Sequence, residues 1–155
     1  HWWPAALLFF AAAVVTDFAD GPVARRRGEV TALGGFLDHV SDAVFVSSGL
    51  AALASEAVVP VLLPVAIVFA FLQYALDSRV LAGQSLRASA LGRYNGIAYF
   101  VVLGIPVVRN GLGLAAPSDG WVWIFGWVVV VSTLVSMADR LLAFGRAGGS
   151  GDAPS

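Results

Sequence analysis

The most informative stretch of this chain is DFADGPVARRRGEVTALGGFLDHVSD, which occupies residues 17–42. It places four aspartates, Asp17, Asp20, Asp38 and Asp42, within sequence that is otherwise strongly apolar. A charged side chain at the centre of a membrane costs about 3 kcal/mol even on insertion-based scales. Four carboxylates so close together therefore indicate a compensating cation or a chemical role, and both indicate a bound metal.

The composition is that of a polytopic membrane protein. Of the 155 residues, 59% are apolar and 12% are charged, whereas soluble domains usually carry about 25% charged residues. There are no cysteines, which excludes disulfides and thiolate metal sites. A net charge of -1, with no basic run longer than Arg25–Arg27, argues against a nucleic-acid partner.

Apolar runs of about 20 residues predict five transmembrane helices in an all-α bundle. The expected helices cover residues 2–20, 32–53, 57–76, 91–108 and 120–144, separated by polar or Pro- and Gly-containing segments. We expect one transmembrane domain over residues 1–145. A tail rich in Gly, Ser and Ala at residues 146–155 is expected to be flexible and cytoplasmic.

The distribution of arginine predicts the orientation of the helices. Arg109 falls at one end of the expected bundle and every other Arg at the opposite end, so the positive-inside rule places the aspartates at the cytoplasmic face. An odd number of helices with an outer start suggests that one earlier helix is missing. We expect an integral protein of a prokaryotic cell membrane, with an outer belt formed by Trp2, Trp3, Trp121 and Trp123.

Helical spacing arranges the aspartates in two stripes. Asp38 and Asp42 lie one turn apart and share a face with Gly34, at spacings of i, i+4 and i+8. In the preceding segment one face is shared by Asp17, Asp20, Gly21 and Ala24, with Arg25 at its margin. Two carboxylate stripes can therefore face each other across a helical hairpin.

Four carboxylates supply the hard oxygen ligands that suit Mg²⁺ or Mn²⁺. Two divalent ions about 4 Å apart would cancel the four charges and leave positions for phosphate oxygens. Small residues at Gly21, Ala24 and Gly34 would leave room for a ligand near the backbone. Pro22 interrupts this pattern, so we expect a kink there or a helix that starts near Asp20.

The residues of both stripes resemble a known family motif. They match the pattern DxxDGxxARx8GxxxDxxxD of the CDP-alcohol phosphatidyltransferase family without a gap. The resemblance implies a membrane transferase that moves a phosphatidyl-type group from a CDP-linked lipid to an alcohol and releases CMP. It also implies a homodimer and six helices, the first of which this chain lacks. The matching residues are Asp17, Asp20, Gly21, Ala24, Arg25, Gly34, Asp38 and Asp42.

The resemblance also implies roles for individual residues. Asp17, Asp20, Asp38 and Asp42 would hold two divalent ions, Mg²⁺ or Mn²⁺, and Asp42 would also act as the general base. The CDP moiety would be bound by Asp20, Gly21, Ala24, Arg25 and Gly34, with Arg25 on the pyrophosphate, where a guanidinium can bind two oxygens at once.

A weaker cluster indicates the acceptor. Arg87, Ser89 and Arg93 fall at the cytoplasmic start of the fourth expected helix and resemble a segment of members that use glycerol phosphate or inositol phosphate. These acceptors are favoured over serine, because the residues after Asp42 lack the FGxAPA-like segment associated with serine-using members. Other alcohols stay open as acceptors.

The aspartates also allow a second interpretation. A polytopic cation carrier could also use intramembrane aspartates, but such carriers commonly contain repeated halves, and the sequence holds no second acidic hairpin.

His39 points about 100 degrees away from Asp38 on a helical wheel, so we expect it to be a packing residue and not a metal ligand.

Overall fold

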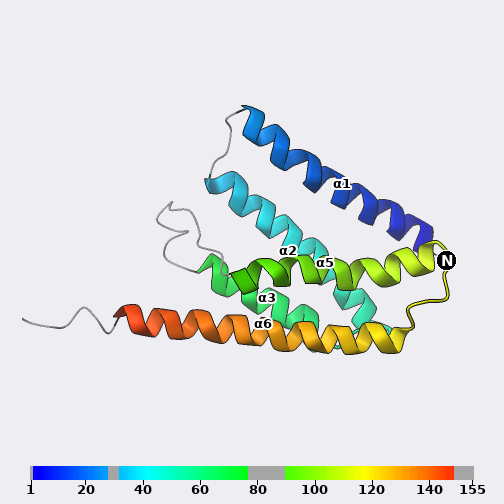
Figure 1. Cartoon of the computed structure of the whole chain (residues 1–155). Coiled ribbons are helices and arrows are strands. Elements are labelled where there is room, and N and C mark those ends of the chain that lie inside the picture. The colour runs from blue at the N-terminus through cyan, green and yellow to red at the C-terminus, as the bar shows by residue number, and fades with distance from the viewer. Residues whose placement is uncertain (1, 28–31, 77–89, 149–155) are drawn as a thin grey trace, which may run out of the picture.

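The computed structural model of the chain describes residues 2–27, 32–76 and 90–148, with side chains described for residues 2–16, 34–76 and 91–142. Within these ranges every regular element is a helix, which confirms the predicted all-α fold. Successive helices run in opposite directions and lie side by side as a bundle (Figure 1). The helices are α1 (Trp3–Arg27), α2 (Ala32–Ser55), α3 (Leu62–Ala75), α5 (Ala90–Gly111) and α6 (Asp119–Gly148).

The first helix was predicted to end at Asp20, with a kink at Pro22 or a new helix that starts near Asp20. In the structure the helix neither ends nor starts at Asp20. Helix α1 continues through Pro22 to Arg27. The missing N–H of a proline disturbs a helix locally, and the residues that follow, Ala24 and Arg25 to Arg27, are strong helix formers. Helix α6 likewise runs to Gly148, past its predicted end at Phe144.

The third helix begins at Leu62 and not at the predicted Ala57. Ala57 has a left-handed backbone with φ of 57°, and its N–H donates to the Ala54 carbonyl at 3.0 Å. The N–H of Val58 donates to the Leu53 carbonyl, also at 3.0 Å. This pair of bonds is the Schellman motif, which terminates α2. The chain bends at Val58 and Val59, and the carbonyl of the buried Pro60 accepts a hydrogen bond from the Leu63 N–H at 3.0 Å as the next helix starts.

The core of the bundle is built by α2, α3, α5 and α6. Leu50, Leu63 and Val102 are completely buried. Helix α1 lies against this core through partly buried side chains, among them Leu7 and Phe10. The core residues with the least exposure are aliphatic and mostly β-branched: Val46, Leu50, Val59, Leu63, Val102, Val122 and Val130.

Glycines allow two close contacts between elements. A Cβ added at Gly104 of α5 would lie 2.7 Å from Cζ of Phe10 in α1. A Cβ at Gly126 of α6 would lie 2.7 Å from Cδ of Pro60, in the connection between α2 and α3. Membrane helices pack closely through small residues because no hydrophobic force draws them together. Gly104 therefore allows the close approach of α1 to α5, as does Gly111 beside Leu7, and Gly126 allows that of α6 to Pro60.

The outer surface of the bundle is apolar, as expected for contact with lipid. In the described part of the chain, α2, α5 and α6 each contain a segment long and apolar enough to cross a membrane. The apolar stretches of α1 and α3 are shorter, at Trp3–Thr16 and Leu62–Ala75. Exposed leucine, valine and phenylalanine side chains are spread over all the helices. The structure thus supports an integral membrane protein, and five complete crossings stay a prediction.

The two ends of the bundle differ in the side chains they carry. Trp2 and Trp121 are exposed at the end where α1 and α6 begin (Figure 1). At that end the buried Arg109 forms an ion pair with Asp119 and donates to the Pro117 carbonyl at 2.7 Å. The described Arg93 and Arg140 lie toward the opposite end. This separation matches the predicted uneven distribution of arginine, and the cytoplasmic placement of one end stays a prediction.

We predict that Ala57→Gly stabilises the protein. A non-glycine residue in the left-handed region costs about 1–2 kcal/mol, and glycine recovers part of this despite its greater freedom in the unfolded chain. The midpoint of thermal unfolding in detergent should therefore rise. The matched control is Ala51→Gly, because Ala51 is exposed in the interior of α2, where glycine costs about 1 kcal/mol. A lower midpoint for Ala57→Gly would contradict the analysis of this turn.

Candidate active site

Both halves of the acidic motif lie at the same end of the bundle, where α1 ends and α2 begins (Figure 1). Because α1 is continuous to Arg27, the residues of the first stripe share one helix, as their predicted common face requires. The side chains of this stripe, at Asp17, Asp20, Gly21, Ala24 and Arg25, lie outside the described ones.

The second stripe is described in full on α2. Asp38 is exposed, and its carbonyl accepts a hydrogen bond from Ser41 Oγ at 2.8 Å. Asp42, one turn later, is partly buried and lines a cavity. Among the described side chains no three His, Asp or Glu residues come together as a metal site. The predicted set of four carboxylates therefore stays a prediction, since two of its members lie outside those side chains.

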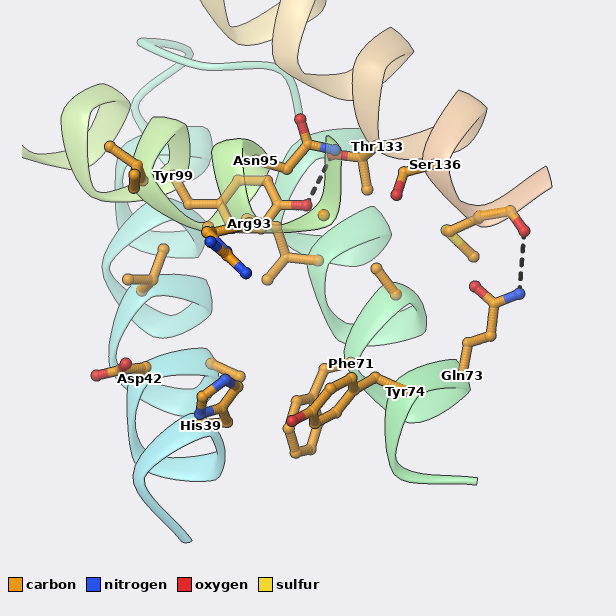
Figure 2. Close-up of a pocket in the computed structure, with 18 of the residues that line it drawn as sticks. His39, Asp42, Phe71, Gln73, Tyr74, Arg93, Asn95, Tyr99, Thr133 and Ser136 are labelled. Carbon is orange, nitrogen blue, oxygen red and sulfur yellow. Dashed lines mark hydrogen bonds between the residues drawn. The ribbon is translucent and has the colours of Figure 1, made fainter. Parts of the chain in front are cut away.

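The cavity lies between α2, α3, α5 and α6 and has a volume of about 590 Å³ (Figure 2). Cavities of this size bind small organic molecules. Three charged side chains contribute to its wall, each from a different helix: Asp42 from α2, Arg93 from α5 and Arg140 from α6. The wall of the cavity thus includes one acidic and two basic residues, which come from three helices.

Arg93 is the one described member of the predicted acceptor cluster. It is exposed at the start of α5, and it lines the cavity together with Asp42 and His39 (Figure 2). Arg87 and Ser89 lie outside the described residues. The structure therefore brings Arg93 to the same space as Asp42, and the other two positions stay predictions.

A stack of rings joins α2 and α3 at the side of the cavity. The His39 ring lies 5.5 Å from the Tyr74 ring, at an interplanar angle of 7°. Cζ of Arg140 lies 5.8 Å from the centre of the same Tyr74 ring, within the range of a cation–π contact. The stack with Tyr74 is a packing contact of the kind predicted for His39, and the absence of a metal role for this residue stays a prediction. This geometry also fixes one face of Tyr74 against His39 and brings the Arg140 guanidinium to its ring.

Uncharged polar groups line the inner part of the cavity, and the sequence analysis missed them. Asn95 is only 4% exposed and accepts a hydrogen bond from Ser132 Oγ at 2.6 Å. The Tyr99 hydroxyl and Thr133 Oγ1 are 2.8 Å apart and hydrogen bonded. Gln73 Nε2 donates to the Met137 carbonyl at 3.0 Å. These bonds connect α5 and α3 to α6 across the cavity.

A signal for this polar wall exists in the sequence. On α6 the residues Thr133, Ser136, Met137 and Arg140 are spaced i, i+3, i+4 and i+7, so they share one face. All four line the cavity. Polar residues that repeat on one face of an apolar helix face the interior of a bundle and not lipid.

Comparisons with known proteins agree with the motif and the helices. A family model described as CDP-alcohol phosphatidyltransferase matches residues 1–138. An archaetidylinositol phosphate synthase of Aeropyrum pernix is 32% identical over 145 residues, which cover 88% of this chain and 71% of that protein. A CDP-diacylglycerol--glycerol-3-phosphate 3-phosphatidyltransferase of Escherichia coli is 51% identical over 47 residues, 30% of this chain and 26% of that protein. No solved structure matches the chain.

The family model covers most of the chain, including the complete acidic motif and the described wall of the cavity up to Met137. Its description names an enzyme class, which agrees with the predicted transferase and not with the alternative of a cation carrier. The chain therefore belongs to the CDP-alcohol phosphatidyltransferase family of membrane enzymes.

Proposed function

We propose that the chain transfers a phosphatidyl-type group from a CDP-linked lipid to a phosphorylated alcohol, either glycerol phosphate or inositol phosphate. The acceptor hydroxyl oxygen forms a bond to the lipid-linked phosphorus, and the bond from this phosphorus to the CMP oxygen breaks. The hydroxyl proton passes to a carboxylate, and CMP leaves. The names of the two relatives contain inositol phosphate and glycerol-3-phosphate, which supports a phosphorylated acceptor.

The observation that carries this proposal is the cavity itself. It places Asp42 of the family motif in the same space as Arg93 and Arg140. A cavity wall that contains an acidic residue and two arginines suits an acceptor that carries both a hydroxyl to be deprotonated and a phosphate to be bound. The cavity lies between helices, so a water-soluble acceptor and a membrane lipid can meet there.

The donor set of the motif fits two Mg²⁺ or Mn²⁺ ions. Asp38 and Asp42 are one turn apart on α2, and all four proposed ligands, with Asp17 and Asp20 on α1, are oxygen donors. Such ions would offset the charge of the carboxylates and of the pyrophosphate.

The motif residues on α1 and at the start of α2 form the proposed CDP site. We assign Asp20, Gly21, Ala24, Arg25 and Gly34 to this moiety, with Arg25 on the pyrophosphate. Both segments lie at the end of the bundle where the chain passes from α1 to α2 (Figure 1). Asp42, further along α2 and partly buried in the cavity wall, is the proposed general base.

The proposed phosphate site for the acceptor consists of Arg93, with Arg87 and Ser89 from the preceding segment. Arg140 joins this site, because it lines the same cavity from α6. Its contact with Tyr74 reduces the number of positions that its long side chain can adopt. A pre-positioned guanidinium loses less entropy when it binds a phosphate.

We further propose that this site faces the cytoplasm of a prokaryotic cell and that the protein is a homodimer. The orientation follows from the arginine distribution, with Arg109 alone at the opposite end. The dimer follows from the resemblance of the motif to the family.

The purified chain should release CMP from a CDP-linked lipid when glycerol phosphate or inositol phosphate is added with Mg²⁺ or Mn²⁺. Chelation of the metal should abolish this release, and addition of the ion should restore it. Chromatographic measurement of CMP tests both statements. The proposal fails if no CMP appears with any alcohol.

Asp42→Asn should lower the rate of CMP release by about 10²- to 10⁴-fold, the usual contribution of a general base. Binding of the CDP-linked lipid should persist, because asparagine keeps one oxygen donor at this position and Asp17, Asp20 and Asp38 still supply carboxylates to the proposed ions. The matched control is Asp139→Asn, since Asp139 is exposed on α6 and is not among the residues that line the cavity. Substantial turnover by Asp42→Asn would remove this residue from the role of base.

Arg93→Ala should raise the KM for the phosphorylated acceptor by about tenfold or more, because a hydrogen bond to a charged group contributes about 1.5–3 kcal/mol. The KM for the CDP-linked lipid should change little. Steady-state kinetics with each substrate varied in turn separates the two constants. An unchanged acceptor KM would contradict the assignment of Arg93.

A further inference from the structure

Two amide side chains in the cavity wall each have one hydrogen-bonding atom that no described group satisfies. Asn95 accepts a bond from Ser132 through Oδ1, but its buried Nδ2 has no partner among the described residues. Gln73 donates to the Met137 carbonyl through Nε2, but its buried Oε1 has no partner there either. Each amide is therefore held in place by one atom and leaves the other unused.

Burying these two polar atoms without hydrogen-bond partners is unfavourable unless a ligand supplies the partners. A buried polar atom without a partner costs about 1–3 kcal/mol, and more than 90% of buried polar groups in proteins are satisfied. The neighbouring Tyr99 and Thr133 hydroxyls bond to each other, and Thr133 also donates to the Val129 carbonyl at 2.8 Å. The hydroxyl groups beside the two amides thus have hydrogen-bond partners. The lack of a partner is therefore particular to Asn95 Nδ2 and Gln73 Oε1.

The chemistry of the two atoms identifies the class of group that fits them. Nδ2 of Asn95 donates a hydrogen bond, and Oε1 of Gln73 accepts one. A phosphate or carboxylate could accept a hydrogen bond from Asn95 Nδ2 but could not donate one to Gln73 Oε1. A cation could bind only Gln73 Oε1. A hydroxyl both accepts and donates, so hydroxyl groups match both atoms. The residues beside them in the wall, Tyr99, Thr133 and Ser136, carry no charge.

We propose that Asn95 and Gln73 form a hydroxyl-recognition subsite that selects a polyhydroxylated acceptor, inositol phosphate in preference to glycerol phosphate. This inference rests on the proposed function, in which Arg93 and Arg140 bind the acceptor phosphate. The ring of inositol phosphate carries several hydroxyls beyond the one that reacts, and a cavity of about 590 Å³ accommodates it. A site built to bind hydroxyls rejects analogues that lack them, because its own polar atoms then stay unpaired.

The test measures binding and does not depend on turnover. Inositol phosphate and a series of its monodeoxy analogues are titrated into the purified full chain by calorimetry. The wild type should bind at least one monodeoxy analogue about tenfold or more weakly than inositol phosphate. Equal affinity for all the compounds, as expected if only water occupies the subsite, overturns the proposal, and so does the absence of binding.

Three variants separate recognition from structure. Asn95→Leu should abolish the preference for inositol phosphate over the deoxy analogue. Ser132→Ala removes the bond to Asn95 Oδ1 but leaves Nδ2 in the wall, so the preference should persist. Asn110→Leu is the matched control, because Asn110 lies on the same helix, bonds Arg109 and does not line the cavity. An Asn95→Leu protein that keeps the preference overturns the proposal.

CMP release, measured in parallel, distinguishes this inference from the proposed function. A wild type that releases CMP but binds all analogues equally keeps the transferase and overturns the subsite. A wild type that discriminates between the analogues but releases no CMP with any acceptor keeps the subsite and overturns the transferase. If Asn95→Leu does not fold, the analogue series with the wild type decides alone.

Discussion

Carboxylates in a membrane protein need a compensating charge, and this constraint organises the whole bundle. Asp38 and Asp42 lie on a helix whose other faces meet apolar residues, so their charge must be balanced by a cation or by water at the end of the bundle. The connection between α1 and α2 brings the rest of the motif to the same end. The acidic motif is therefore confined to one end of the bundle, opposite the Arg109–Asp119 ion pair, and the middle of each helix is free to be largely apolar.

The other helices add positive charge at the cavity that the acidic hairpin borders. Arg93 on α5 and Arg140 on α6 bring positive charge to the space that Asp42 borders. Tyr74 on α3 stacks on His39 and lies under the Arg140 guanidinium, so one ring connects three helices. The cavity wall is thus assembled from segments far apart in the chain, and its charges have opposite signs on different helices.

The features that sequence could predict are those that repeat within one helix. The spacing of the aspartates, the apolar runs and the uneven distribution of arginine predicted the helices, the motif and the end of the bundle that carries it. The predicted start of α3 was wrong because the left-handed Ala57 and the bend at Val58 and Val59 depend on local backbone geometry and not on hydropathy. The polar wall was missed because Asn95 and Gln73 form hydrogen bonds to residues of another helix. The packing of α3, α5 and α6 that brings these partners together cannot be read from the spacing within one helix.

The same hydrogen bonds that hold this wall together also direct its unused atoms. Lipid and protein interiors are equally apolar, so helix association in a membrane depends on packing and on interhelical hydrogen bonds. The Ser132 to Asn95 bond and the Gln73 to Met137 bond both connect α6 to another helix, and each orients an amide. Replacing either amide by a hydrocarbon would remove the unsatisfied atom together with the interhelical bond. A bundle that needs these bonds for its stability therefore holds, with no additional residue, an unpaired donor and an unpaired acceptor on residues of the cavity wall.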